Sequence, residues 1–193
     1  MLKKVLLVLA LATLLPSAVF AQNYKIDPAH SQIEFTVDHL MFFKVSGFFT
    51  DFVGTIEADP ANKTLNAAEA TIQTTSIDTR IAKRDTHLRS ADFFDAANHP
   101  ELRFVSKKVE GSGHSISVTG DLTIRGVTHE VVLTGAFLGE QKDPWGNQRA
   151  GFVAKGKINR KDYGLTWNKA LETGGVMVGD DVEITLQVQG IKS

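Results

Sequence analysis

Histidine is the side chain that most often binds a metal or carries a proton near neutral pH. The chain has six histidines and no cysteine. No two of these histidines stand four residues apart, as they would on one side of a helix, and no His-Glu-x-x-His motif occurs. The sequence therefore predicts no metal site. The six histidines are His30, His39, His87, His99, His114 and His129.

His39 continues the apolar side of a predicted strand over residues 31–39. Ile33, Phe35 and Val37 alternate with polar residues there, so these side chains share one side. A lone imidazole at the end of an apolar surface fits contact with the polar head of a ligand. It fits equally a histidine that is hydrogen-bonded inside a core, and the spacing does not separate the two interpretations.

Residues 84–89, Arg-Asp-Thr-His-Leu-Arg, form the densest polar cluster of the chain. On a helix, positions three or four apart are neighbours, so Arg84 lies beside His87 and Asp85 can pair with Arg89. Arg84 and His87 would then offer hydrogen-bond donors to an anionic or carbonyl oxygen. Composition alone favours another interpretation, in which this cluster is the solvated face of a helix held by salt bridges.

Catalytic nucleophiles and acid–base pairs have little support in the sequence. No Gly-x-Ser-x-Gly motif occurs. His30 and Ser31 are neighbours on an extended segment, so their side chains point to opposite sides. Asp180 and Asp181 stand in a Gly-containing turn, which is typical of solvated carboxylates. We therefore assign no catalytic residue.

The first 21 residues are typical of an export signal. Two lysines precede an apolar run over residues 5–15, and Val19 and Ala21 place small residues at the third and first positions before a cleavage site. The apolar run is shorter than the roughly 20 residues that span a bilayer. We therefore expect residues 1–21 to be removed, residues 22–193 to form a single domain, and the mature protein to be periplasmic.

The charge of the mature chain excludes some partners. The signal would carry away two of the 21 basic residues and none of the 22 acidic ones, which leaves a formal charge of −3. Nucleic acids and anionic lipid surfaces need clustered Lys and Arg, so we expect no nucleic-acid partner. Without cysteine there is no disulfide, and stability must come from the core and the backbone hydrogen bonds.

Most of the mature chain is predicted to form short strands. Besides residues 31–39, strands are expected at 45–58 (long and bent, or two with a bulge), 68–75, 103–110, 114–124, 128–138, 148–159 and 181–191. Many short strands with turn signals between them indicate a sandwich or a barrel. A barrel of about eight strands has room for side chains or for one small ligand, and periodicity does not separate a filled lumen from a hollow one.

Residues 78–97 break the strand pattern and predict a helical insertion. Asp78 or Thr79 is a candidate cap for its start, and Ser90 for a second short helix. The insertion ends before Pro100, because the residue preceding a proline is disfavoured in a helix.

Several segments, in order along the chain, resemble motifs of the YceI-like family of exported bacterial proteins. The resemblance covers essentially the whole mature chain. Its most specific part is Ser-Ile-Asp-Thr at 76–79 followed by residues 84–95. The other matching segments are 24–31, 35–41, 45–54, 120–128, 159–168 and 178–182.

This resemblance implies an all-β fold, an antiparallel lipocalin-like β-barrel of about eight strands with a helical insertion near residues 78–97. Family members are described as binding polyisoprenoids or other long-chain amphiphiles in a long apolar cavity, with no established catalytic activity. The polar head would lie near the insertion, with His39, Arg84 and His87 as its candidate contacts. The candidate wall residues are Phe35, Val37, Phe49, Ile72, Phe104, Leu122, Phe152 and Trp167.

We therefore expect a periplasmic carrier that binds a long-chain isoprenoid, such as an isoprenoid quinone or a prenyl phosphate, and needs no other cofactor. One alternative is an enzyme that acts on a lipid head group with His39, His87, Asp85 and Arg84. Another is a structural protein with a filled core. Transient contact with a membrane stays open, as does a homodimer formed through an edge strand.

Overall fold

The computed structural model describes residues 21–172 and 174–193, so the predicted signal lies outside the described residues except for Ala21. The strands are β1 (Gln22–Ile26), β2 (Gln32–His39), β3 (Phe43–Phe49), β4 (Phe52–Asp59), β5 (Thr64–Gln73), β6 (Ile77–Asp78), β7 (Glu101–Ser112), β8 (Ser115–Ile124), β9 (Val127–Lys142), β10 (Gln148–Asn159) and β11 (Val178–Lys192). The helices are α1 (Ala82–Arg89) and the short 3-10 turns η1 (Pro28–His30), η2 (Thr74–Ser76) and η3 (Arg160–Tyr163).

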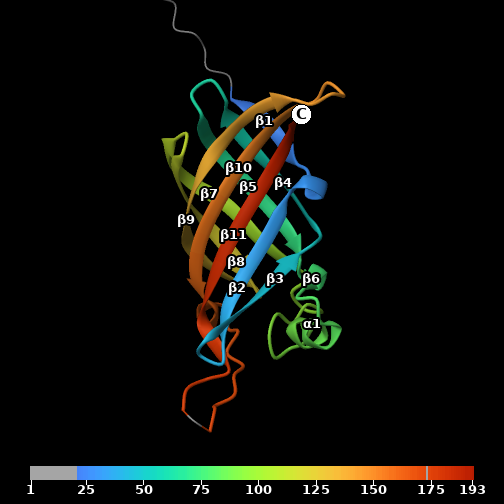
Figure 1. The fold of residues 1–193 in the computed structure, drawn as a ribbon, viewed down its shortest axis with the longest axis vertical. Helices are drawn as coiled ribbons and strands as arrows, with labels where there is room; N and C mark the ends of the chain where they lie inside the picture. The colour runs from blue at the N-terminus through green and yellow to red at the C-terminus, as the bar shows by residue number, and fades with distance from the viewer. Residues whose placement is uncertain (1–20, 173) are drawn as a thin grey trace, which may run out of the picture.

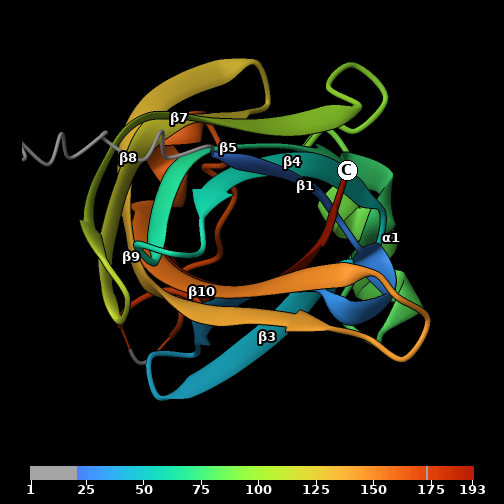
Figure 2. The same ribbon diagram turned by 90° about the horizontal axis from the view of Figure 1, so that it is seen from above.

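All of these strands belong to one antiparallel sheet that closes on itself. Its order is β1-β4-β5-β7-β8-β9-β10-β11-β2-β3-β6, and a further pairing of β1 with β11 completes the ring. β1 and β2 lie one after the other along the same edge of β11, and β3 continues into β4 beside them. The described strands thus form a closed barrel of eight strands, which Figure 2 shows from one end. The predicted fold class is confirmed.

The structure differs from the predicted strands in two places. The segment 45–58 is two strands, β3 and β4, separated by Thr50 and Asp51. β1 was not predicted, although Tyr24 and Ile26 alternate with polar residues there. Five residues give too short a pattern to identify a strand, and only the pairing of β1 with β4 and β11 defines it.

Alternation of side chains produces the apolar interior. In β8, every second residue is buried while the residues between them are only partly covered. Burial of apolar surface stabilises the fold by about 25 cal/mol per Å². A slip of one residue in strand pairing would turn the whole apolar side outward and lose this energy, so the register of the strands is strongly specified. Buried side chains gather in two clusters, one with Tyr163 and Leu165 and the other with Tyr24 and Phe137.

The insertion between β6 and β7 is mostly turn, and it lies at one end of the barrel (Figure 1). Its helix α1 is shorter than the prediction over 78–97. The predicted first caps are wrong, because Ile81 holds the N-cap position and gives no side-chain hydrogen bond. The Asp78 carboxylate instead accepts from the backbone N–H of Arg80 at 2.7 Å.

The predicted second helix after Ser90 is also absent among the residues described. The backbone N–H and the hydroxyl of Ser90 both donate to the carbonyl of His87, at 3.1 and 2.7 Å, and this ends α1. Turns follow over residues 91–94. Within the described ranges, no helix has the length and apolar character that crossing a bilayer would require.

Candidate functional site

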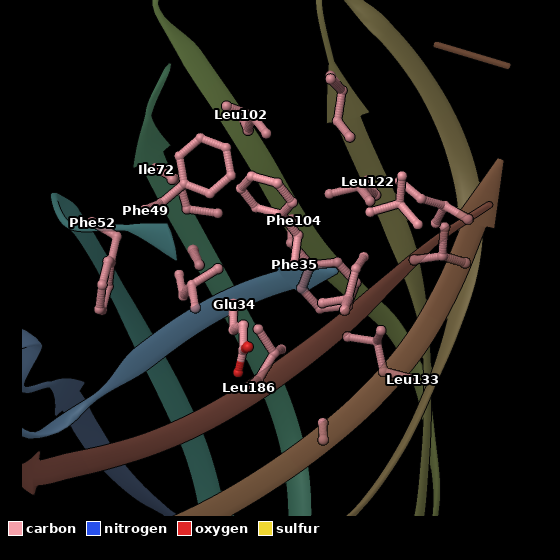
Figure 3. Close-up of a pocket in the computed structure, with 18 of the residues that line it drawn as sticks. Glu34, Phe35, Phe49, Phe52, Ile72, Leu102, Phe104, Leu122, Leu133 and Leu186 are labelled. Carbon is pink, nitrogen blue, oxygen red and sulfur yellow. The ribbon is translucent and has the colours of Figure 1, made fainter. Parts of the chain in front are cut away.

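An apolar cavity occupies the lumen of the barrel. Its volume is about 250 Å³, far more than one water molecule needs and close to the lower range of small-molecule sites. Phe35, Phe49 and Phe104 come from β2, β3 and β7 and gather in the same part of the lumen (Figure 3). Because the wall is almost entirely hydrocarbon, the cavity suits a ligand that gains stability from leaving water rather than from directed contacts.

The structure brings most of the predicted wall residues together at this cavity. The residues that line it are Phe35, Val37, Phe49, Ile72, Phe104, Leu122 and Phe152. Trp167 does not line it. The indole ring instead packs on His87 at 4.9 Å and on Phe93 at 5.2 Å between ring centroids. Contact of any of these side chains with a ligand stays a prediction.

The insertion supplies lining residues that sequence analysis did not identify. Leu88, Phe93 and Phe94 reach the cavity from α1 and the turns after it. The ring of Phe94 meets that of Phe49 edge to face, with 5.8 Å between centroids. Phe93 and Phe94 form an apolar pair among charged residues, and this was the available signal that the insertion packs inward.

A glycine makes room for one of the wall aromatics. Gly47 on β3 is paired with Phe35 on β2, and a Cβ at this position would lie 2.4 Å from the end of the Phe35 ring. The ring therefore lies directly over the backbone of β3. The same ring is tilted against Phe49 at 5.8 Å between centroids.

Arg84, a predicted head-group contact, is engaged within the insertion. Its Nε and Nη2 atoms donate to the hydroxyl and the carbonyl of Thr79, at 2.7 and 2.8 Å. Asp85 is buried, and it accepts from the backbone N–H of Thr79 at 2.8 Å. The predicted pair between Asp85 and Arg89 is wrong, since the Arg89 guanidinium donates to the carbonyl of Ile77 at 2.8 Å.

His87 and His39 lie in different surroundings. The Nε2 atom of His87 is 2.9 Å from the Asp92 carboxylate, and its ring meets Phe93 edge to face. His39 ends β2, where it is paired with Phe43 on β3. The lining of the cavity contains none of the three predicted head-group residues.

Arg160 is the cationic residue that borders the cavity, and sequence analysis did not single it out. Its side chain is 4% exposed and donates to the carbonyls of Leu165, Trp167, Val178 and Gly179. Burial lowers the pKa of its guanidinium below the usual value. One side chain thus fastens both ends of the segment 164–179, and its N–H groups are directed at backbone oxygens.

Tyr163 follows Arg160 at the end of η3 and also lines the cavity. Its side chain is 1% exposed, and its ring meets His129 edge to face at 5.1 Å between centroids. Burial raises the pKa of its hydroxyl to about 12, so the hydroxyl stays protonated at neutral pH. Within the described ranges this hydroxyl has no hydrogen-bond partner.

The described residues contain no cluster of side chains suited to binding a metal ion. Among residues 21–172 and 174–193, no three His, Asp or Glu side chains gather so that they could hold a metal ion. The paired carboxylates Asp180 and Asp181 contact different cations, Lys161 and Lys157.

A closed antiparallel barrel around an apolar lumen defines the class of lipocalin-like β-barrels. The model of the YceI-like domain family matches residues 24–190, and the chain belongs to this family. The protein YceI of Escherichia coli is 40% identical over 194 residues, which are 98% of each chain.

Solved structures show the same fold. The YceI protein of Campylobacter jejuni has a TM-score of 0.70 and 32% identity, over 81% of this chain and 90% of that one. A polyisoprenoid binding domain from Saccharophagus degradans has a TM-score of 0.64 and 14% identity, over 88% of this chain and 98% of that one.

Proposed function

We propose that the chain is a periplasmic carrier that holds a long-chain isoprenoid, or a similar amphipathic lipid, in the lumen of its barrel. The apolar cavity inside the closed barrel carries this proposal. An isoprenoid tail is nearly insoluble, and its burial is worth about 25 cal/mol per Å². The binding activity in the name of the Saccharophagus degradans domain, which shares this fold, supports the same assignment.

Extraction of the purified protein tests this function. Folded protein from a host that makes prenyl lipids is extracted with organic solvent and the extract is analysed by mass spectrometry. We expect a long-chain amphiphile in amounts close to one per protein. If extracts repeatedly contain none, and delipidated protein takes up none when it is added, the function is wrong.

Transient contact with a membrane belongs to this proposal, because a carrier must collect an insoluble lipid. The turn between β2 and β3 presents three consecutive apolar side chains, and Phe42 is 83% exposed. The neighbours of Phe42 are Met41 and Phe43, and the turn is held to the segment before β11 by a 2.9 Å hydrogen bond from the Leu40 N–H to the Met177 carbonyl.

Vesicle binding tests the role of this turn. We expect Phe42→Ser with Phe43→Ser to reduce co-sedimentation with phosphatidylcholine vesicles severalfold, because the wild-type rings can enter the interface. Trp145→Ser is the matched control, since Trp145 is equally exposed in the turn between β9 and β10 at the other end of the barrel (Figure 1). If both variants lose the same fraction of vesicle binding, the turn between β2 and β3 is not the part of the protein that contacts the membrane.

An enzyme acting on a lipid head group is the alternative. It would use His39, His87 and Asp85, yet Asp85 is bonded to Thr79 and His87 to Asp92. These contacts favour structural roles for both side chains. A His87→Ala variant that binds lipid normally but no longer converts it would favour the enzyme.

A further inference from the structure

The apolar cavity stops before the end of the barrel that holds β1 (Figure 1). In four strands, a residue that lines the cavity stands two positions from a buried residue that does not line it. Residues two apart on a strand face the same side, so in each of these strands the interior changes from hollow to filled toward the same end. The lining and the buried residue of each pair are Ile26 and Tyr24, Ile56 and Ala58, Val118 and Ile116, and Phe152 and Ala150.

Five buried side chains, which we call the end plug, fill the barrel beyond the cavity. None of the five lines the cavity, and each is at most 5% exposed. They come from five different strands and pack in one cluster with wall residues such as Val118 and Phe152. The end plug consists of Tyr24, Ala58, Ile116, Phe137 and Ala150. These side chains close the lumen at the end that holds β1.

Two aromatic side chains are the largest members of the end plug. The hydroxyl of Tyr24 on β1 donates to Glu140 on β9 at 2.7 Å, so this side chain reaches past the intervening strands β10 and β11. Gly190 on β11 leaves room for it, since a Cβ there would lie 2.7 Å from the Cβ of Tyr24. The Phe137 ring packs on that of Phe152 at 5.0 Å between centroids. Because Phe152 lines the cavity and Phe137 does not, Phe137 lies behind this part of the wall.

The opposite end of the lumen is built from residues outside the barrel strands. They come from the insertion, from η3 and from the segment after it, and they are Leu88, Phe93, Phe94, Tyr163 and Leu165. The Arg125 guanidinium joins the two parts by donating to the carbonyls of Ala91 and Gly164, at 3.1 and 2.8 Å. The end plug stands on paired strands, whereas α1 and the turns after it can move without breaking the sheet. We therefore expect a lipid to enter at the insertion end, tail first.

We propose that the end plug sets the greatest length of isoprenoid tail that the lumen accepts, and that Phe137 fixes this limit. This inference rests on the proposed lipid-carrier function. The tip of the tail lies against Phe152 and Val188, which are paired across β10 and β11 and line the cavity next to the plug. A tail longer than the lumen leaves carbon atoms in water at the insertion end, and that exposure selects against it.

Competition among isoprenoid alcohols tests this limit. Delipidated protein is mixed with phosphatidylcholine vesicles that contain equal amounts of linear alcohols from geraniol to solanesol, a series that grows by one isoprene unit at each step. The protein is separated by flotation, and its bound alcohols are measured by mass spectrometry. An isoprene unit that moves from the bilayer into the lumen stays in apolar surroundings, whereas a unit left in water should lower uptake about tenfold or more. Wild-type protein should therefore show a sharp upper limit of tail length.

Two variants should move this limit in opposite directions. Phe137→Ala removes a ring of about the size of an isoprene unit, so the first alcohol that wild-type protein excludes should gain about threefold to tenfold in uptake. Val188→Phe adds a ring inside the lumen and should exclude the longest alcohol that wild-type protein accepts. It removes no core side chain, so it tests the limit even if Phe137→Ala does not fold. Leu138→Ala is the matched control, because Leu138 is the exposed neighbour of Phe137 on β9, and it should keep the wild-type limit.

The results distinguish this inference from the carrier function. Uptake of every alcohol by wild-type protein without an upper limit overturns the role of the end plug and leaves the carrier function standing. A folded Phe137→Ala or Val188→Phe variant that keeps the wild-type limit does the same. Failure of wild-type protein to take up any of the alcohols overturns both.

Discussion

The ring of Phe35 has room in the lumen because its partner across the strand pair, Gly47, has no side chain. This ring lies over Gly47, where a Cβ would be 2.4 Å from one ring carbon and 2.8 Å from the methyl group of Thr79. The Gly47 backbone is compatible with other residues, since its φ is not in the left-handed region. Space rather than conformation therefore makes glycine necessary here.

Gly47→Ala should destabilise the protein by about 1–3 kcal/mol, because the Phe35 ring must move away from its position. Urea denaturation measures the change. Gly151→Ala on β10 is the control, since its new Cβ would lie 3.6 Å from Leu138, an ordinary contact. We expect that variant to match or slightly exceed wild-type stability. Equal effects of the two substitutions would contradict the steric argument.

At the end of the barrel where β1 lies, the guanidinium of Arg149 joins elements that are far apart in the chain. Arg149 on β10 donates to Asp27 after β1 at 2.7 Å, to Asp143 in the turn before β10 at 2.7 Å, and to Gln189 on β11 at 2.6 Å. Hydrogen bonds from Arg149 hold the pKa of both carboxyl groups below the usual value. His30 also contacts Asp27, at 2.8 Å.

This arrangement predicts how stability depends on pH. A carboxylate with a lowered pKa in the folded protein contributes stability above its ordinary pKa of 3.8, and that contribution is lost as the pH falls through the lowered value. Arg149→Met should therefore destabilise the protein most near neutral pH, and the difference from wild type should shrink in acid. Urea denaturation at a series of pH values measures this difference. A difference that grows below the ordinary pKa would contradict the assignment.

At the scale of the whole molecule, the barrel closes where β11 pairs with the edge that β1 and β2 form together. β1 meets β11 through only three residue pairs, Tyr24 with Lys192, Lys25 with Ile191 and Ile26 with Gly190. The ring that results is lined by apolar side chains from most of its strands, and it leaves space at its centre. A ligand that occupies this space binds only the folded chain and should stabilise it.

Filling the lumen should abolish that stabilisation. Phytol at about a hundred times its dissociation constant should stabilise wild-type protein by about 2.7 kcal/mol, seen as a rise in Tm. Ala154→Phe places a ring in the cavity, because Ala154 lines it, and should remove the rise. Lys155→Phe on the outer side of the same strand is the control and should keep it. A full response from Ala154→Phe would place the ligand elsewhere.

Local pattern was sufficient for much of the fold, whereas most of the predicted cavity wall came from the resemblance to the YceI-like family. Alternation with a period of two is a property of neighbouring residues, so it identified the long strands and put Ile33, Phe35 and Val37 on one side, which faces the cavity. The resemblance to the YceI-like family then selected a barrel over a sandwich. The roles of Arg84 and His87 were harder to assign, because a polar side chain takes its role from the partners that folding brings to it.

Tertiary structure alone decided the features that depend on residues distant in sequence. β1 is a strand because β4 and β11 offer it backbone partners, and the engagement of Arg160 depends on carbonyls at 165 and 179 that only the folded segment brings together. The hollow lumen also depends on residues that are distant in sequence. Apolar side chains facing inward can fill a barrel or leave space, and the difference lies in how rings from opposite walls meet, which no single strand encodes.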